Sequence, residues 1–151
     1  MRLVIAADHN GVALKQLLVS ALERDGHHVD DRGTHDSGEV VDYPGLCEDV
    51  CRQVVDGAAD RGIVVGGSGM GEVIACNKVR GIRAGLCVDE FHATISRRNN
   101  DANVLVLGAK VLSDSEAEHI TATWMSTSFS GGVHQRRLEQ LAALERDEPS
   151  P

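Results

Sequence analysis

The sequence predicts an α/β protein with a single Rossmann-like, doubly wound domain, in which helices flank a five-stranded parallel sheet. Two observations predict this class. Short apolar runs rich in β-forming residues alternate with segments of helical periodicity along the chain. The 151 residues, of which 42% are hydrophobic, suffice for one ordinary core. We therefore expect a domain over residues 1–146 and a flexible tail over residues 147–151.

Five short runs without proline are expected to be the strands: Arg2–Ala7, His27–Arg32, Gly62–Val65, Arg83–Val88 and Asn103–Gly108. Parallel strands need helical crossovers, and these are right-handed, so helices should cover both faces of the sheet. The carboxyl ends of the strands then share one edge, where ligands bind in folds of this kind.

Apolar periodicity predicts the first two helices. Within Leu14–Leu22, apolar residues recur at i, i+3, i+4, i+7 and i+8, and this face ends before Gly26. Leu46, Val50 and Val54 repeat the spacing in the second helix. Each of these faces is expected to pack against the sheet.

Two more helices follow the fifth strand. The stretch SDSE, Ser113–Glu116, is typical of a capping box that opens a helix through Trp124. A last helix is expected over about residues 133–146. Cys47 and Cys51 lie one turn apart on the second helix, which suits core residues better than ligands.

Charge and cysteine content exclude several classes of protein. Fifteen lysines and arginines against 23 acidic residues give a net charge of −8, which argues against nucleic acid and requires any anionic ligand to be held locally. The four cysteines form no CxxC pair and no zinc spacing, and the chain enters a strand without a signal peptide, which predicts the reducing cytoplasm. No apolar run approaches the roughly 20 residues that span a bilayer, so no membrane partner is expected.

The loop after the first strand, Asp8–Gly11, places an acid and an imidazole at the carboxyl edge. Asp8 also suits a helix start, and both interpretations stay open, although His9 adds nothing to a cap. A later loop, Asp42–Gly45, has a proline that fits a first helical turn. That loop also holds Tyr43, the single tyrosine of the chain.

The loop GGSGMGE, Gly66–Glu72, follows the third strand. Its backbone N–H groups can converge on an anion at the start of a helix. The pattern is neither a dinucleotide fingerprint nor a P-loop. Glu72 falls in the first helical turn, where a glutamate either complements the helix dipole or acts as the base that proton abstraction beside a carbonyl requires. Ser68 is placed to share protons between two substrate oxygens.

Two further segments carry polar clusters. Ser96–Asn103 leads into the fifth strand with several amides and two arginines, and surface turns have the same composition. Val133–Arg137 places an imidazole and two guanidiniums at the start of the last helix, which suits a phosphate. A solvated helix face is the alternative.

Together these motifs resemble the ribose-5-phosphate isomerase B family, which includes galactose-6-phosphate isomerase subunits. The match runs in order through ADHNG, DYP, GGSGMGE, IACNK, GIRA, NNDANVLVLGAKV and HQRR. The resemblance implies a Rossmann-like domain and a homodimer or dimer of dimers with active sites shared between subunits. It also implies aldose–ketose isomerisation of a small sugar phosphate through an enediolate, without metal or cofactor.

The resemblance assigns roles to residues. The loop matching Gly66–Gly71 holds the enediolate oxygens. Many members carry a cysteine base at the position of Gly66, and a subset that lacks it uses a glutamate at the position of Glu72; this chain is similar to that subset. The catalytic candidates are Glu72, Ser68 and Asp8. The candidates for substrate binding are His9, Tyr43, Gly66, Gly67, Gly69, Met70, Gly71, Asn99, Asn100, Lys110, His134, Arg136 and Arg137.

Three positions depart from the family pattern. Asn99 stands where ribose-phosphate isomerases usually have a histidine implicated in opening the sugar ring, and an amide transfers no proton near neutral pH. Lys110 replaces a common arginine and so loses its bidentate fork, and Val133 replaces another arginine that often binds phosphate. The remaining phosphate candidates are His134, Arg136, Arg137 and Lys110 itself.

A tetrose 4-phosphate explains the asparagine, because its phosphorylated terminal oxygen cannot close a furanose ring. Family members of erythritol-type catabolism are similar in having asparagine there. We therefore expect interconversion of D-erythrulose 4-phosphate and D-erythrose 4-phosphate, with ribulose 5-phosphate and ribose 5-phosphate as the alternative. The competing class is a non-catalytic module that binds a sugar phosphate or nucleotide. Against it, Glu72 would repel a phosphate placed on its loop.

Overall fold

A computed structural model describes residues 1–146 of the chain; the expected tail over residues 147–151 lies outside the described residues. Five strands form one sheet in the order β2-β1-β3-β5-β4, and every pair is parallel. The strands are β1 (Arg2–Ala7), β2 (His28–Gly33), β3 (Arg61–Gly66), β4 (Ala84–Leu86) and β5 (Val104–Gly108). The predicted five-stranded α/β fold is confirmed.

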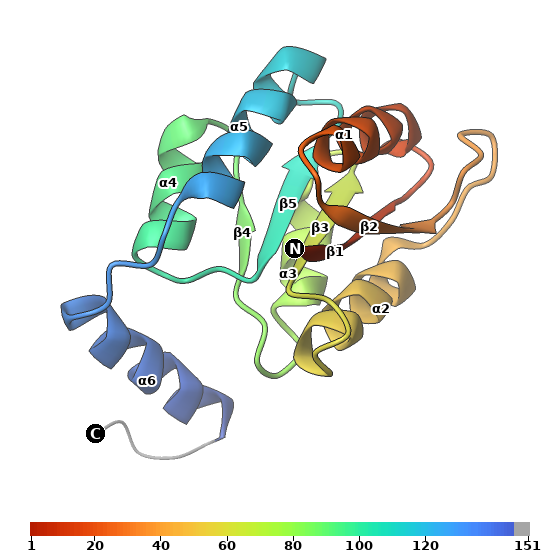
Figure 1. Ribbon diagram of the computed structural model, residues 1–151. Coiled ribbons are helices and arrows are strands. Elements are labelled where there is room, and N and C mark those ends of the chain that lie inside the picture. The colour runs from red at the N-terminus through yellow and green to blue at the C-terminus, as the bar shows by residue number, and fades with distance from the viewer. Residues whose placement is uncertain (147–151) are drawn as a thin grey trace.

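Helices cover both faces of the sheet (Figure 1). They are α1 (Val12–Arg24), α2 (Tyr43–Val55), α3 (Met70–Cys76), α4 (Glu90–Arg98), α5 (Asp114–Ser126) and α6 (Val133–Glu145). One core cluster joins α1, α4 and α5 to one face of the sheet, and the other joins α2 and α3 to the opposite face. The arrangement is the doubly wound one that right-handed crossovers produce.

The core forms where the strands are apolar on both sides. Ile63, Val64 and Val65 of β3 are fully buried, and their side chains alternate between the two clusters. Burying an aliphatic side chain of this size stabilises a fold by roughly 1.5–3 kcal/mol. Cys47 and Cys51 belong to the core under α2, as the sequence predicted.

Two expectations about local structure were inaccurate. Residues 96–98 of the segment Ser96–Asn103 belong to α4, which begins after the N-cap Asp89. The fourth strand is shorter than Arg83–Val88 and comprises only Ala84–Leu86. At the start of α5, by contrast, the predicted capping box of Ser113 and Glu116 is present.

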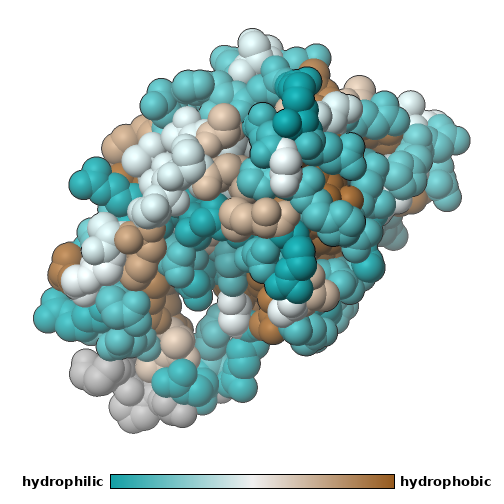
Figure 2. All heavy atoms as spheres, in the orientation of Figure 1, coloured by the Kyte–Doolittle hydropathy of each residue, from teal (hydrophilic) through white to brown (hydrophobic). Residues whose placement is uncertain are grey.

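Helix α6 lies apart from the layered body of the molecule, beyond the amino ends of the strands (Figure 1). Ala143 is its one buried residue. The helix is fastened near its end, where the Glu145 carboxylate accepts a hydrogen bond from Gly81 N at 3.2 Å and the Glu145 carbonyl accepts one from Arg80 at 2.8 Å. Figure 2 shows apolar residues around a hollow between α6 and the body, and Leu141 and Leu144 line a groove there.

Candidate active site

The site begins at a topological switch point between two neighbouring strands. Strands β1 and β3 are adjacent, but α1 follows β1 on one face while α3 follows β3 on the other. The chain thus leaves these two strands toward opposite faces of the sheet, and ligands bind at the carboxyl edge beside such a point in folds of this kind. The loops Asp8–Gly11 and Gly66–Glu72 lie next to each other at this point, with the Asn10 side chain against Gly67.

Backbone contacts fix the glycine loop. Residues after β5 extend the sheet pairing, since Ala109 N donates to the Gly66 carbonyl at 2.8 Å and Lys110 N donates to the Gly67 carbonyl at 2.9 Å. Gly69 has a φ of 79°, a left-handed conformation that glycine adopts without steric cost. The backbone N–H groups of Gly67, Ser68 and Gly71 have no acceptor within residues 1–146. These donors are available to an oxyanion.

Glu72 lies under this loop with only 4% of its surface exposed. Its carboxyl group occupies the space beside Gly66, where an added Cβ would overlap the carboxyl and lie 2.8 Å from Cγ. No hydrogen bond or ion pair joins the carboxylate to another residue of the described chain. The absence of a side chain at position 66 is therefore what admits the carboxylate, and the loop leaves it without a competing partner.

Asp8 is also buried, but its carboxylate is engaged. Oδ1 accepts hydrogen bonds from Asn10 N at 2.9 Å and Gly11 N at 3.2 Å, and Oδ2 accepts one from the Asn10 side chain at 3.0 Å. These bonds form a turn closed by the Asp8 side chain just before α1, whose N-cap is Gly11 without a side-chain cap. His9 contacts the Asn10 amide through Nε2 at 3.2 Å, and Val41 N donates to its Nδ1 at 3.4 Å.

The same edge collects most of the other predicted residues. The Tyr43 ring, at the start of α2, lies so close to Gly71 that a Cβ there would be 2.7 Å from the phenol oxygen. Ser68 is exposed, and its hydroxyl accepts a hydrogen bond from Met70 N at 3.3 Å. Lys110 is exposed beside the loop. The carboxyl-edge cluster consists of Asp8, His9, Tyr43, Gly66, Gly67, Ser68, Gly69, Met70, Gly71, Glu72 and Lys110.

The remaining predicted residues lie at the opposite edge of the sheet. Asn99 and Asn100 follow α4 and precede β5, so they belong to the amino ends of the strands. Arg137 lines a groove with Asn100. Arg136 and Arg137 are exposed and form no ion pair with another residue in 1–146. The amino-edge cluster consists of Asn99, Asn100, His134, Arg136 and Arg137, and one copy of the chain does not bring it to the carboxyl-edge cluster.

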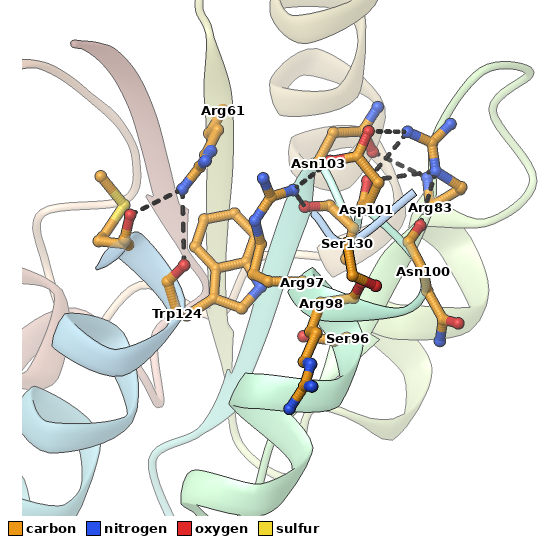
Figure 3. A network of polar contacts seen from close by, with 12 residues as sticks. Arg61, Arg83, Ser96, Arg97, Arg98, Asn100, Asp101, Asn103, Trp124 and Ser130 are labelled. Atoms are coloured by element: carbon orange, nitrogen blue, oxygen red, sulfur yellow. Dashed lines mark hydrogen bonds and ion pairs between the residues drawn. The ribbon is translucent and has the colours of Figure 1, made fainter. Parts of the chain in front are cut away.

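Sequence reasoning missed several residues that shape these clusters. Asn10 bridges Asp8 and His9 and lies against Gly67, where a Cβ would be 3.4 Å from its side-chain nitrogen. Its place in the quoted motif DHNG was the available signal. At the amino edge, the charged network around Asp101 in Figure 3 had no signal beyond a turn composition.

No cysteine lies in either cluster, and all four are buried and unpaired. Contacts with the Cys47 and Cys51 thiols, together with burial, raise the pKa of Cys76 far above its ordinary value. Burial raises the pKa of Cys87 to about 11. Among residues 1–146, no group of three or more His, Cys, Asp or Glu side chains is arranged to hold a metal ion. Within the same range no helix has the length and apolar character of a membrane span.

A buried carboxylate beside free backbone donors, at the carboxyl edge of a parallel sheet, is a site suited to proton transfer on a small anion. Comparison with known proteins places the chain in the class of sugar-phosphate isomerases. The family model described as Ribose/Galactose Isomerase matches residues 3–141, and the chain belongs to this family.

Similar proteins span nearly the whole length. The chain is 39% identical over 145 residues to ribose-5-phosphate isomerase B of Escherichia coli K12, covering 96% of this chain and 97% of that protein. It is 33% identical over 148 residues to D-erythrulose-4-phosphate isomerase of Pectobacterium atrosepticum, covering 98% and 97%. The solved structure of Clostridium thermocellum ribose-5-phosphate isomerase B matches with a TM-score of 0.95 and 41% identity, covering 97% and 99%.

Proposed function

We propose that the protein interconverts a ketose phosphate and an aldose phosphate through an enediolate, with Glu72 as the base. The observation that carries this proposal is the position of Glu72: a buried carboxylate with no partner in the described chain lies beside loop amides with no acceptor. A carboxylate held ready beside oxyanion donors suits removal of a proton next to a carbonyl. A sensor of sugar phosphates has no need for this pairing.

In the proposed reaction, the Glu72 carboxylate removes a proton from C1 of the ketose, and the electron pair forms the C1–C2 double bond of the enediolate. The backbone N–H groups of Gly67, Ser68 and Gly71 stabilise the negative charge on the oxygens. The Ser68 hydroxyl passes a proton from O1 to O2. Protonated Glu72 then returns its proton to C2, which leaves the aldose and restores the carboxylate.

The amino-edge cluster would complete the site from a second copy of the chain. This cluster lies at the edge of the sheet opposite Glu72. Two of its members, Arg136 and Arg137, have exposed guanidiniums without an ion-pair partner in the described residues. Free guanidiniums suit a phosphate group. A homodimer or dimer of dimers with shared sites accounts for both clusters.

D-Erythrulose 4-phosphate is our preferred substrate, with D-erythrose 4-phosphate as product. Asn99 offers no acid or base for opening a sugar ring, and a tetrose 4-phosphate needs none. The Pectobacterium relative carries this activity in its name. Ribose 5-phosphate is the second candidate, because the E. coli relative and the C. thermocellum structure, at 39% and 41% identity, carry that substrate in their names.

Two measurements test the proposal. Equilibration with the ketose phosphate in deuterated water should place solvent deuterium in substrate and product, and unexchanged ligand would indicate a binding module. Specificity constants for the two substrates should then favour the tetrose phosphate. A value for ribose 5-phosphate equal to or above that for the tetrose would refute the preferred substrate.

The variant Asn99→His should improve only the use of ribose 5-phosphate, provided that the imidazole reaches the ring oxygen.

A further inference from the structure

Asp101 has an unusual backbone for a residue with a side chain. Its φ is 45°, and no other non-glycine residue in 1–146 has a positive value. The left-handed region is unfavourable for residues with a Cβ, although aspartate tolerates it better than most. Such a conformation persists where surrounding contacts enforce it, and it often marks a functional segment.

Two arginines enforce the conformation of Asp101 (Figure 3). Arg97 Nη1 donates to Asp101 Oδ1 at 2.9 Å and to the Ala102 carbonyl at 2.6 Å. From the other side, Arg83 Nη2 donates to the Asp101 carbonyl at 2.9 Å, and Arg83 Nε donates to the Asn100 carbonyl at 2.9 Å. The backbone of residues 100–102 is thus held at each carbonyl in turn.

Arg97 is in turn fixed by the core, where it shares the Trp124 ring with a third arginine, Arg61. The Arg97 guanidinium lies 5.5 Å from the centre of the Trp124 ring, and Arg61 of β3 lies 5.2 Å from the same ring. Trp124 is fully buried, and the Arg97 side chain is only 7% exposed. Burial lowers the pKa of Arg61, the charge of Arg97 lowers it further, and Asp101 opposes the effect. The Asp101 carboxylate, together with Asp60, thus offsets the positive charge of two arginines that lie on one indole ring.

The network is not needed to join the neighbouring strands. Strands β4 and β5 pair through their backbones, and Asn103 ties their entrances by accepting from Arg83 N at 2.8 Å and donating to the Gly81 carbonyl at 2.9 Å. What the network fixes is the short segment after α4. Ser130 also ties the linker before α6 to the end of α4. Its backbone N and its Oγ both donate to the Arg98 carbonyl, at 3.0 and 2.8 Å.

We propose that Asp101 is a positioning residue, which holds the turn that presents Asn99 and Asn100 to the active site of a second copy of the chain. The side chains of Asn99 and Asn100 form no hydrogen bond with the described chain, so only their backbone determines where they point. This inference rests on the shared site of the proposed function.

The kinetic test uses Asp101→Asn, which tolerates the left-handed conformation but loses the charge. Turnover divided by KM should fall about 10- to 100-fold, as expected when a binding group moves by about 1 Å, with the melting temperature close to wild type. Asp101→Gly removes the steric cost of the left-handed backbone but also removes the carboxylate, so its turnover divided by KM should fall by a similar factor. The control Asp49→Asn breaks an arginine pair elsewhere, Asp49 with Arg32, and should keep wild-type kinetics. Wild-type kinetics in Asp101→Asn would overturn the proposal.

Subunit mixing tests whether the defect acts on the partner. Glu72→Gln and Asp101→Asn, each with low kcat/KM alone, should regain up to about a quarter of the wild-type kcat/KM after subunit exchange, because half of randomly formed dimers are mixed and carry one intact site. Glu72→Gln mixed with a chain that carries both substitutions should regain nothing.

A parallel mixture of Glu72→Gln with Arg137→Ala, also assayed as kcat/KM at substrate far below KM, separates the two hypotheses, since it depends on the shared site but not on Asp101. Recovery in this mixture without recovery in the Asp101 mixture would overturn the positioning role alone. If neither mixture recovers, the shared site is wrong, and the inference about Asp101 fails with it.

Discussion

At the scale of single residues, the lack of a side chain at position 66 decides where the Glu72 carboxylate, the proposed base, can lie. The Glu72 carboxyl fills the volume that a side chain at Gly66 would need. The sequence presented a missing cysteine and a glutamate six residues later as separate facts. The structure joins them in one small space, so the residue at position 66 controls where the carboxylate lies.

Glu72→Gln should reduce turnover by two to four orders of magnitude, the usual range for a positioned base. The amide keeps the shape of the side chain but accepts no proton. Turnover should be measured with saturating substrate, together with thermal melting and substrate affinity, which should both stay near wild type. Glu23→Gln, on the exposed side of α1, is the matched control. Wild-type turnover in the Glu72 variant would refute the assignment.

Gly66→Ala should also disable the enzyme, although it removes no functional group. The new methyl group overlaps the Glu72 carboxyl, so either the glutamate or the loop has to move. A displacement of about 1 Å at a catalytic group costs on the order of 100-fold in rate. Gly45→Ala is the control and should stay active, because an added methyl group there meets open space. Gly57→Ala is unsuitable because its φ of 76° would strain an alanine. Full activity of Gly66→Ala would mean that the carboxylate works from another position.

At the scale of elements, local patterns predicted the strands and helices well because apolar periodicity is a property of neighbouring residues. The capping box at Ser113 is local too, and it is present. The end of α4 was missed for the opposite reason. Arg97 lies in a segment whose composition is typical of a surface turn. Its burial depends on contacts with Trp124 and Asp101, which the local pattern does not reveal.

Arg137 of α6 is exposed and forms no ion pair within residues 1–146. Arg137→Ala should raise KM about tenfold or more and change turnover little, because a phosphate contact is present in both the ground state and the transition state. Steady-state kinetics with the preferred substrate would measure this. Arg24→Ala is the control and should leave KM unchanged, because Arg24 is an exposed arginine of α1 that forms no ion pair within residues 1–146. An unchanged KM for Arg137→Ala would place the phosphate elsewhere.

At the scale of the whole molecule, the two clusters lie at opposite edges of one sheet. In a parallel sheet, a loop that follows a strand lies at the carboxyl edge and a loop that precedes a strand lies at the amino edge, so chain order assigns the edge once the strands are known to be parallel. The turn after α4 precedes β5 and lies at the amino edge, whereas the glycine loop follows β3 and lies at the carboxyl edge. The residues of each edge were candidates from their loops alone, whereas their grouping into one site comes from the resemblance to the family and stays a prediction.

Activity should depend on protein concentration. If each site needs two copies, specific activity should fall as the enzyme is diluted through the dissociation constant of the dimer. Sedimentation velocity at the same concentrations would show whether the fall follows the appearance of monomer. Added substrate should shift both curves to lower concentration, because it binds only the assembled site. A monomer with full activity would contradict the shared site.

The overlap of Gly66 and Glu72 also constrains the order in which substitutions can accumulate. A chain that exchanges a carboxylate base for a thiol base must change both positions. If cysteine arrives first, two side chains compete for one volume, and if the glutamate leaves first, the site holds no base. Both single-step intermediates are therefore expected to be impaired. A chain can therefore pass from one form of the site to the other only through a less active variant, because one small volume cannot hold both a cysteine side chain and the Glu72 carboxyl.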